Sequence, residues 1–166
     1  FIQNDLRTLD VFGEWFLNKT TKDLYVYFGS NDPTSYTVQA AIKDVLFDCG
    51  VGGYMGGVST TAYTNISVNN IDFEGANMTA YNSFNGSSNS ISGCTINNCY
   101  NGIFFWNVAG STSTGNTITN VLNDAIYQDG QVSSPTTITN NTIRNVGLFE
   151  GMGSSSEGGT YSGINQ

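Results

Sequence analysis

Apolar residues recur at a regular interval along residues 64–164, each time inside the same short polar phrase. The phrase reads apolar residue, two residues, Asn, one residue, Ile, with Ser113 and Cys94 as single departures from it. It occurs four times, at Ile66–Ile71, Ile91–Ile96, Ser113–Ile118 and Ile138–Ile143. The closing isoleucines are 25, 22 and 25 residues apart. This period is too short for a separate domain and is typical of a stacked repeat.

The phrase predicts two short β-strands joined by a sharp turn. Two isoleucines spaced this way cannot form a helical stripe, but the two strands point both of them into one interior. Asn suits the turn because it tolerates a left-handed backbone. Stacked coils then place Asn69, Cys94, Asn116 and Asn141 in one column. A second column contains Asn98, Asn120 and Asn145, with Cys99, Val121 and Val146 behind it.

Three short strands in each turn of the repeat describe a parallel β-helix. The Asn-x-Ile phrases, followed by Gly102-Ile103 and Gly163-Ile164, resemble the repeats of pectate-lyase-like proteins. Upstream, Gly13–Asn18 and Thr21–Tyr27 resemble the hairpin that precedes the β-helix in bacterial carbohydrate-active members. The resemblance implies a secreted protein that acts on polysaccharide, although the same fold also carries other activities.

These observations predict an all-β protein, a right-handed parallel β-helix of about five coils with an N-terminal β-hairpin. We expect residues 1–35 to form the hairpin and linker, and residues 36–166 to form the repeats. The chain opens on Phe1 and stops just after the coil-like Gly163-Ile164, so we expect it to be a piece of a longer β-helix. Uncapped coils expose strand edges, which makes end-to-end self-association an open expectation.

Composition limits the partners. The 166 residues have a formal net charge of −8 and only five Lys or Arg, which argues against nucleic acid and against an anionic polymer, whereas a neutral glycan fits more easily as the partner. No apolar stretch predicts membrane insertion. Histidine is absent, which excludes a Ser-His-Asp triad within this chain, and the three cysteines have no metal-like spacing. No metal site or cofactor is predicted, apart from Ca²⁺ as a bridge between acidic groups.

The strand that follows each Gly-Ile step is the candidate binding surface. If Met78, Ile103 and Ile126 point inward, alternation turns a row of aromatic residues outward. We therefore predict that Tyr81, Phe104, Trp106 and Tyr127 bind substrate. Exposed rings beside a carboxylate suit a sugar, whose C–H faces stack on rings while its hydroxyls need polar partners. The resemblance also implies a substrate on this face, whereas the alternative is that loops 82–88 and 147–162 cover these rings.

A glycosidase needs two carboxylates beside the scissile bond. Asp129 and Glu150 are the predicted catalytic pair, with Glu157 third. A polysaccharide lyase is the competing enzyme, but it needs basic groups that this segment has few of. The third alternative is a non-catalytic adhesive or fibre module. An ice-binding face is disfavoured, because Thr117-Ile118-Thr119 and Thr137-Ile138-Thr139 fall at different places in the repeat. All the favoured alternatives predict an extracellular protein.

Overall fold

The computed structural model describes residues 5–51, 61–130, 134–148 and 163–165. The described residues form β-strands and turns, with only two short 3₁₀ helices, η1 (Leu6–Thr8) and η2 (Pro33–Ser35). The chain divides into two compact units, Phe1–Gln39 and Ala40–Gln166. The sequence-based boundary was placed slightly earlier, after residue 35. Among the described residues, no helix is long and apolar enough to cross a bilayer.

The first unit contains the predicted hairpin. Strands β1 (Trp15–Leu17) and β2 (Leu24–Val26) pair antiparallel. The turn between them is built by local polar contacts: the Asn18 side chain accepts hydrogen bonds from the backbone N–H groups of Thr20 and Thr21, and Lys22 has a φ of 67°. An Asn carbonyl that bonds the backbone two and three residues ahead stabilises such a turn.

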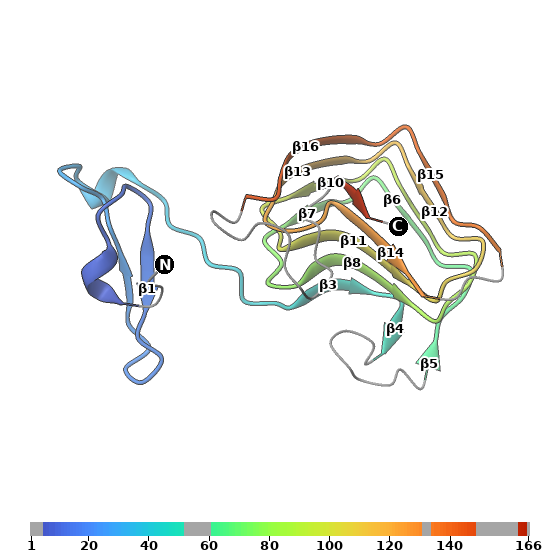
Figure 1. Ribbon diagram of the computed structural model, residues 1–166, viewed down its shortest axis with the longest axis horizontal. Helices are drawn as coiled ribbons and strands as arrows, with labels where there is room; N and C mark the ends of the chain where they lie inside the picture. The colour runs from blue at the N-terminus through green and yellow to red at the C-terminus, as the bar shows by residue number, and fades with distance from the viewer. Residues whose placement is uncertain (1–4, 52–60, 131–133, 149–162, 166) are drawn as a thin grey trace. The chain divides into compact units, whose positions relative to one another are not determined.

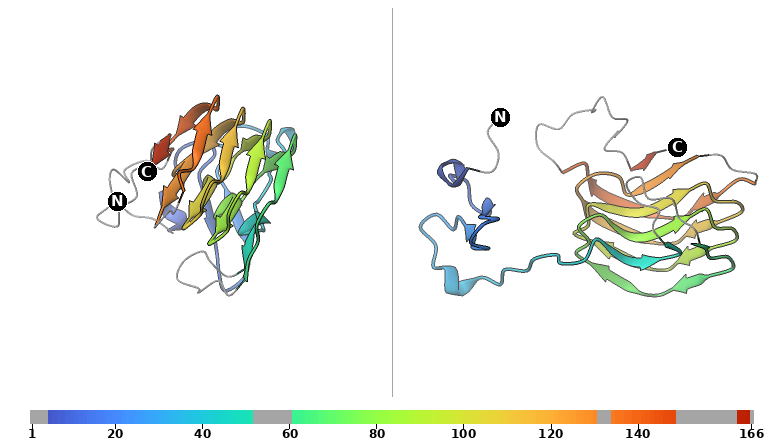
Figure 2. Two further views of the ribbon diagram at one scale, coloured as in Figure 1. Left: turned by 90° about the vertical axis from the view of Figure 1, so that its right-hand side faces the viewer. Right: turned by 90° about the horizontal axis from the view of Figure 1, so that it is seen from below.

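The second unit is a solenoid with three parallel sheets (Figures 1 and 2). The first sheet contains β6 (Ser67–Asn69), β9 (Ser90–Ser92), β12 (Thr112–Thr114) and β15 (Thr137–Thr139). The second contains β7 (Asp72–Glu74), β10 (Thr95–Asn97), β13 (Thr117–Val121) and β16 (Thr142–Val146). The third contains β3 (Val45–Asp48), β8 (Thr79–Phe84), β11 (Asn101–Trp106), β14 (Ile126–Asp129) and β17 (Ile164–Asn165). A separate antiparallel pair is formed by β4 (Gly50–Val51) and β5 (Thr61–Ala62).

Each strand of these three sheets pairs in parallel with the strand one coil away, as a β-helix requires. The first and second sheets have four strands each, so three full turns of the solenoid separate the first strand of each sheet from its last. The prediction of about five coils is therefore slightly high, while the all-β parallel β-helix with an N-terminal hairpin is confirmed.

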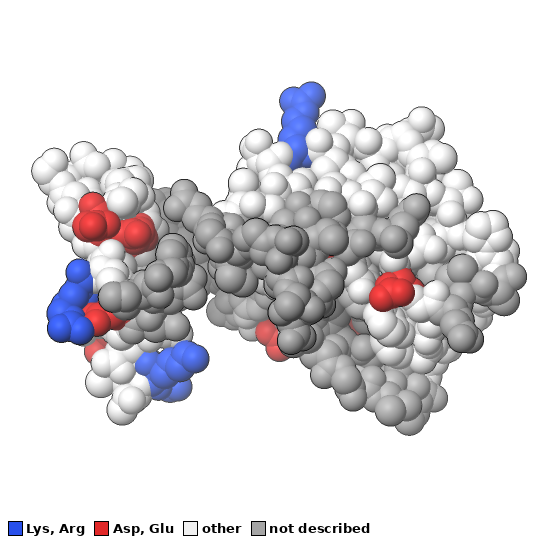
Figure 3. Space-filling model, viewed as in Figure 1, with Lys and Arg blue, Asp and Glu red and all other residues white. Residues whose placement is uncertain are grey.

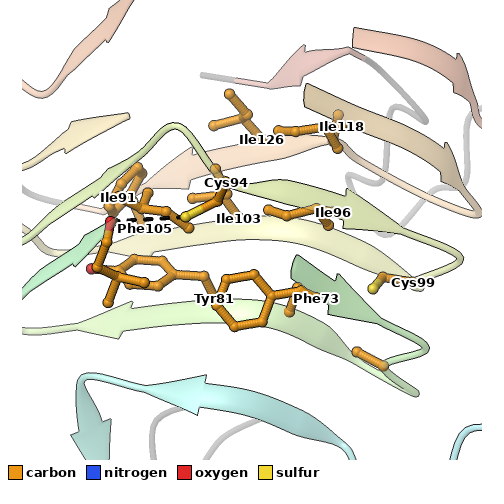
Figure 4. Packing of buried hydrophobic residues seen from close by; sticks show 14 of the residues in the cluster. Phe73, Tyr81, Ile91, Cys94, Ile96, Cys99, Ile103, Phe105, Ile118 and Ile126 are labelled. Atoms are coloured by element: carbon orange, nitrogen blue, oxygen red, sulfur yellow. Dashed lines mark hydrogen bonds between the residues drawn. The ribbon is translucent and has the colours of Figure 1, made fainter. Parts of the chain in front are cut away.

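The interior is filled by the inward residue of each strand. Columns such as Phe73, Ile96, Ile118 and Ile143 run along the solenoid, one residue from each coil. Figure 4 shows the labelled isoleucines and aromatic residues packed in one interior. The three cysteines are buried and unpaired with one another, so they act as small apolar side chains there. Burial raises the pKa of the Cys49 and Cys99 thiols.

The corners between strands repeat as columns of left-handed residues. One column contains Gly75, Asn98, Asn120 and Asn145, each with φ between 53° and 69°. The predicted second asparagine column is therefore confirmed, and the amide of Asn145 donates to Asn120 at 3.0 Å. Gly and Asn accept this backbone conformation at lower cost than most residues, which explains why they recur at this corner.

The first predicted column is wrong in one member. Ile71, rather than Asn69, occupies the position of Cys94, Asn116 and Asn141, because Asp72 pairs with Thr95. The first coil is thus displaced by two residues, and Phe73 replaces Ile71 as the inward residue. The rest of the column forms a ladder in which Asn116 Oδ1 accepts from the Cys94 N–H at 2.9 Å and Asn141 Oδ1 accepts from the Asn116 N–H at 2.9 Å.

Candidate functional site

The candidate site is the outer face of the sheet made by β3, β8, β11, β14 and β17. The strand register sorts its outward residues into two neighbouring columns. One column contains Asp48, Asn82, Phe104 and Tyr127. The other contains Phe84, Trp106 and Asp129. We call the set Phe84, Phe104, Trp106, Tyr127 and Asp129 the aromatic face.

Tyr81 does not belong to this face, so its predicted outward placement is wrong. It pairs with Ile103, points into the solenoid and has no exposed surface. Its ring packs against Phe47 and Phe105 at centroid distances of 6.0 Å each, and its hydroxyl accepts a hydrogen bond from Cys49 Sγ (3.5 Å). Burial raises the pKa of the Tyr81 phenol well above its usual range. A side chain enclosed in this way fills the core and makes no contact with a ligand on the outer face.

Phe84 occupies the position that was predicted for Tyr81, and sequence reasoning missed it. A signal for the correct alignment lies in the turns. Asn85, Asn107 and Gly130 each follow the last outward residue of their strand, and all three have positive φ. Aligning these turn residues places Phe84, Trp106 and Asp129 in one column without reference to the apolar pattern.

The four rings of the aromatic face lie almost parallel. Phe104 and Tyr127 stack at a centroid distance of 4.9 Å with 4° between their planes. Trp106 is parallel to Phe84 (6.2 Å, 5°) and to Phe104 (6.3 Å, 2°). Because adjacent coils are about 4.8 Å apart, rings stacked at this distance turn their faces along the solenoid, toward the neighbouring coils.

Trp106 lies at a step in this arrangement. Its partner in the preceding coil is Phe84, but its partner in the following coil is Asp129. On the side of the indole that is turned toward β14, the paired position in the register therefore holds a short carboxylate in place of another ring. Trp106 and Tyr127 are partly exposed and Asp129 is exposed, so this step is open to solvent.

Asp129 is held in place by two hydrogen bonds. The Tyr127 hydroxyl donates to Asp129 Oδ2 at 3.0 Å, and the Gly130 N–H donates to Oδ1 at 2.5 Å. Burial, this hydrogen bond and the charges of Asp129 and Asp124 raise the pKa of Tyr127 to about 12. Tyr127 is therefore a neutral hydrogen-bond donor near pH 7 and is poorly suited to act as a base.

The predicted catalytic pair stays a prediction, because Glu150 and Glu157 lie outside the described residues. The other described carboxylates of this sheet do not replace them. Asp48 is three coils from Asp129, about 14 Å along the solenoid, which exceeds the separation that a glycosidase pair needs. Asp124 is buried at a corner, where its backbone N–H donates to Asn101 Oδ1 at 3.1 Å.

Two further polar side chains lie at the other end of the same sheet. Asn82 is almost completely buried, and its amide donates to Asp48 Oδ1 at 2.7 Å. Asp48 Oδ1 also accepts from the Gly50 N–H at 3.0 Å. The side-chain oxygen of Asn82, Oδ1, has no hydrogen-bond partner among the residues that the structure describes. These contacts orient the first coil, and they place a second acidic group on the sheet.

Positive charge is scarce around the site. Only Lys43 and Arg144 of the five basic residues belong to the second unit. Arg144 lies on β16, in a different sheet, and Lys43 precedes β3. Figure 3 shows only scattered charged side chains over the described surface of this unit on the side in view. Within the described ranges, no cluster of His, Cys, Asp and Glu is placed to hold a metal ion, and the predicted Ca²⁺ bridge stays a prediction.

Comparison with known proteins identifies the family. A family model described as a right handed beta helix region matches residues 34–165. No curated protein and no solved structure matches the chain significantly. The matched range contains every strand of the three parallel sheets, and it confirms the right-handed β-helix predicted from the sequence. The chain therefore belongs to the right-handed β-helix family.

Proposed function

We propose that the second unit binds polysaccharide on its aromatic face. Polysaccharide binding is consistent with a right-handed β-helix, but the fold itself does not select among lyases, hydrolases and adhesive modules. The proposal therefore depends on the side chains of one sheet. As part of this proposal, the protein is extracellular and bacterial, and it is of the pectate-lyase-like type.

The observation that carries the proposal is the parallel set of four partly exposed rings that ends beside the carboxylate of Asp129. Partly exposed aromatic side chains offer apolar surface to the C–H groups of a pyranose ring. An oriented carboxylate accepts hydrogen bonds from sugar hydroxyls, and such charge-assisted bonds are stronger than neutral ones. Two adjacent columns across three coils span a patch about 10 Å along the solenoid, enough for more than one sugar unit.

Glycoside hydrolysis is the reaction that we propose for this face if it is catalytic, with Asp129 and Glu150 as the pair and Glu157 as the substitute. A retaining enzyme needs carboxyl groups about 5 Å apart, and an inverting enzyme needs about 6.5–9.5 Å. Asp129 supplies one oriented and exposed group toward that requirement.

The experiment is a binding screen of the purified chain against soluble polysaccharides by affinity electrophoresis, with Kd measured for any ligand by calorimetry. We expect the Trp106→Ala variant to weaken binding about tenfold, because the indole supplies the largest ring of the face. Thr114→Ala is the matched control, since Thr114 lies on the outer side of a different sheet. Equal Kd values for the wild type and Trp106→Ala would overturn the proposal, as would the absence of any polysaccharide ligand combined with end-to-end polymers in light scattering.

A further inference from the structure

We propose that the step between Trp106 and Asp129 is a subsite for a protonated amino group, so that the preferred ligand is a polysaccharide with free amino sugars. This inference rests on the proposed polysaccharide binding. The inference adds that binding depends on the charge of the sugar: amino sugars bind most tightly, neutral sugars less tightly and uronic acids least.

The first argument is geometric. Trp106 pairs with Asp129 in the register, and its ring is parallel to rings that face along the solenoid. A group placed above Asp129 therefore meets the indole face on one side. An ammonium group over an indole face gains a cation–π interaction, and it also gains an ion pair with a neighbouring carboxylate.

The second argument is the state of Asp129. Its two oxygens accept hydrogen bonds from the Tyr127 hydroxyl and the Gly130 N–H, which orient the carboxylate without neutralising it. Among the described residues, the one ion pair joins Arg7 to Asp5 in the first unit. Within the described part of the chain, Asp129 therefore has no ion-pair partner, and a carboxylate can accept more than two hydrogen bonds.

The third argument is the surrounding charge. The buried carboxylate of Asp124 is close enough to contribute to the raised pKa of Tyr127. Neither basic residue of the second unit lies on the outer face of β8, β11 or β14. Among the described residues of the second unit, a uronic acid carboxylate at this step meets the negative charges of Asp129 and Asp124 and is repelled, whereas an ammonium group is attracted.

The test compares two trimers with the same backbone, the β-1,4-linked trimer of glucosamine and its fully N-acetylated counterpart, by calorimetry at a pH where the free amines are protonated. We expect the free-amine trimer to bind about 5- to 20-fold more tightly, from one exposed ion pair and one cation–π contact. The difference is expected to shrink as salt concentration rises.

Two matched variants separate the subsite from the general attraction of an acidic protein for a cation. Asp129→Asn and Asp72→Asn change the net charge equally, but Asp72 lies on β7 of a different sheet and is exposed there. We expect Asp129→Asn to abolish the preference for the free-amine trimer and Asp72→Asn to keep it. The quantity compared is the ratio of the Kd values for the two trimers. A loss of folding would weaken the binding of both trimers and would not mimic a selective loss of the preference.

The outcomes distinguish this inference from the proposed function. If both trimers bind equally, or if Asp129→Asn keeps the preference, the amino subsite is wrong while polysaccharide binding stands. If neither trimer binds but a neutral or uronic polysaccharide does so through Trp106, the amino subsite is also wrong. If no saccharide of any kind binds, both proposals fail.

Discussion

Two sheets of the same solenoid carry opposite kinds of outer surface. The sheet of β6, β9, β12 and β15 presents a face of Ser and Thr hydroxyls with one Asn amide, which we call the hydroxyl face. It consists of Ser67, Asn69, Ser90, Ser92, Thr112, Thr114, Thr137 and Thr139. Its side chains bond to one another from coil to coil, as in the 2.9 Å bond from Ser90 Oγ to Ser67 Oγ and the 3.2 Å contact between the Thr114 and Thr139 hydroxyls. The aromatic face has parallel rings and a carboxylate in the equivalent outward positions.

The comparison shows which positions of a coil are constrained. Both sheets have parallel pairing and alternate inward and outward residues, because both face the same interior. Outward positions do not contribute to that interior, so their chemistry varies from sheet to sheet. Short hydroxyl side chains bond mainly with one another, whereas large rings leave apolar surface beside Asp129. This contrast is the reason that we propose the aromatic face, rather than the hydroxyl face, as the surface that binds a ligand.

The largest expected effect tests which residue of β8 is inside. We expect Tyr81→Ala to lower the free energy of unfolding by about 3–5 kcal/mol, because it leaves a cavity between Phe47 and Phe105. The partly exposed Phe84 is the matched control, and Phe84→Ala is expected to cost only about 1–2 kcal/mol. Urea unfolding measures both. Equal losses in the two variants would show that β8 does not have the register described.

The second effect concerns the ladder at the corner between the first two sheets. The buried amide of Asn116 donates to the Ile91 carbonyl at 3.1 Å, and its oxygen accepts from the Cys94 N–H. Removing the side chain leaves both backbone groups buried without these partners, so Asn116→Ala is expected to cost about 2–4 kcal/mol.

Asn69→Ala provides the comparison for this ladder, since the exposed Asn69 lies on the hydroxyl face and outside the corner column. We expect it to change the free energy of unfolding by less than about 0.5 kcal/mol. A cost for Asn69→Ala as large as that for Asn116→Ala would restore the column predicted from the sequence.

The two alignment errors have different physical consequences. Misplacing the first coil by two residues, Asn69 for Ile71, keeps the alternation of the strand, because a strand alternates with a period of two, but it makes Phe73 the inward residue and leaves Ile71 exposed at the corner. Misplacing β8 by three residues, Met78 for Tyr81, exchanges its two faces and turns a core tyrosine into an apparent ligand contact. The spacing between paired residues of adjacent coils varies from 22 residues, between Tyr81 and Ile103, to 38 residues, between Ile126 and Ile164, so an average period does not determine the register of each strand.

The fold was therefore more predictable than the site. Regular inward isoleucines and left-handed asparagines together specify the solenoid, and three of the four predicted substrate-binding residues, Phe104, Trp106 and Tyr127, do lie on the aromatic face. Their contact with substrate stays a prediction, as do the roles of Asp129, Glu150 and Glu157. Phe84 was missed because an outward residue has no partner in the apolar pattern and is located only through the register of its neighbours.

The third effect tests the turn that holds Asp129. Gly130 has a φ of 91°, and a Cβ at this position would clash with Asn107 Oδ1 and lie 2.9 Å from the Asn107 backbone nitrogen. We expect Gly130→Ala to cost about 1–3 kcal/mol and to weaken saccharide binding, because the Gly130 N–H that orients Asp129 must move.

Gly115→Ala is the control for backbone strain alone. Gly115 also has positive φ, at 67°, but a Cβ there meets no atom within 4 Å. It is expected to cost about 1 kcal/mol and to leave saccharide binding unchanged. If Gly115→Ala weakens binding as much as Gly130→Ala, the orientation of Asp129 is not the cause.

The smallest effect is a change in the titration of Tyr127. Its pKa is raised to about 12 by burial, by its hydrogen bond to Asp129 and by the charges of Asp129 and Asp124. The pKa in the unfolded chain is about 10, so the neutral phenol contributes stability below pH 10, and this contribution is lost as the pH rises toward 12. Asp129→Asn removes one charge and weakens the hydrogen bond, while burial persists. We therefore expect the Tyr127 pKa to fall only part of the way toward 10.

Phenolate absorbance measures this change, with Tyr127→Phe subtracted to isolate one signal among the nine tyrosines. Asp72→Asn is the control, because it removes an equal charge on another sheet and is expected to leave the Tyr127 titration in place. A titration that is the same in Asp129→Asn and in the wild type would mean that the 3.0 Å contact between Tyr127 and Asp129 does not hold in solution. Asp129 would then be oriented by the Gly130 N–H alone, and the amino subsite would lose one of the two bonds that position its carboxylate.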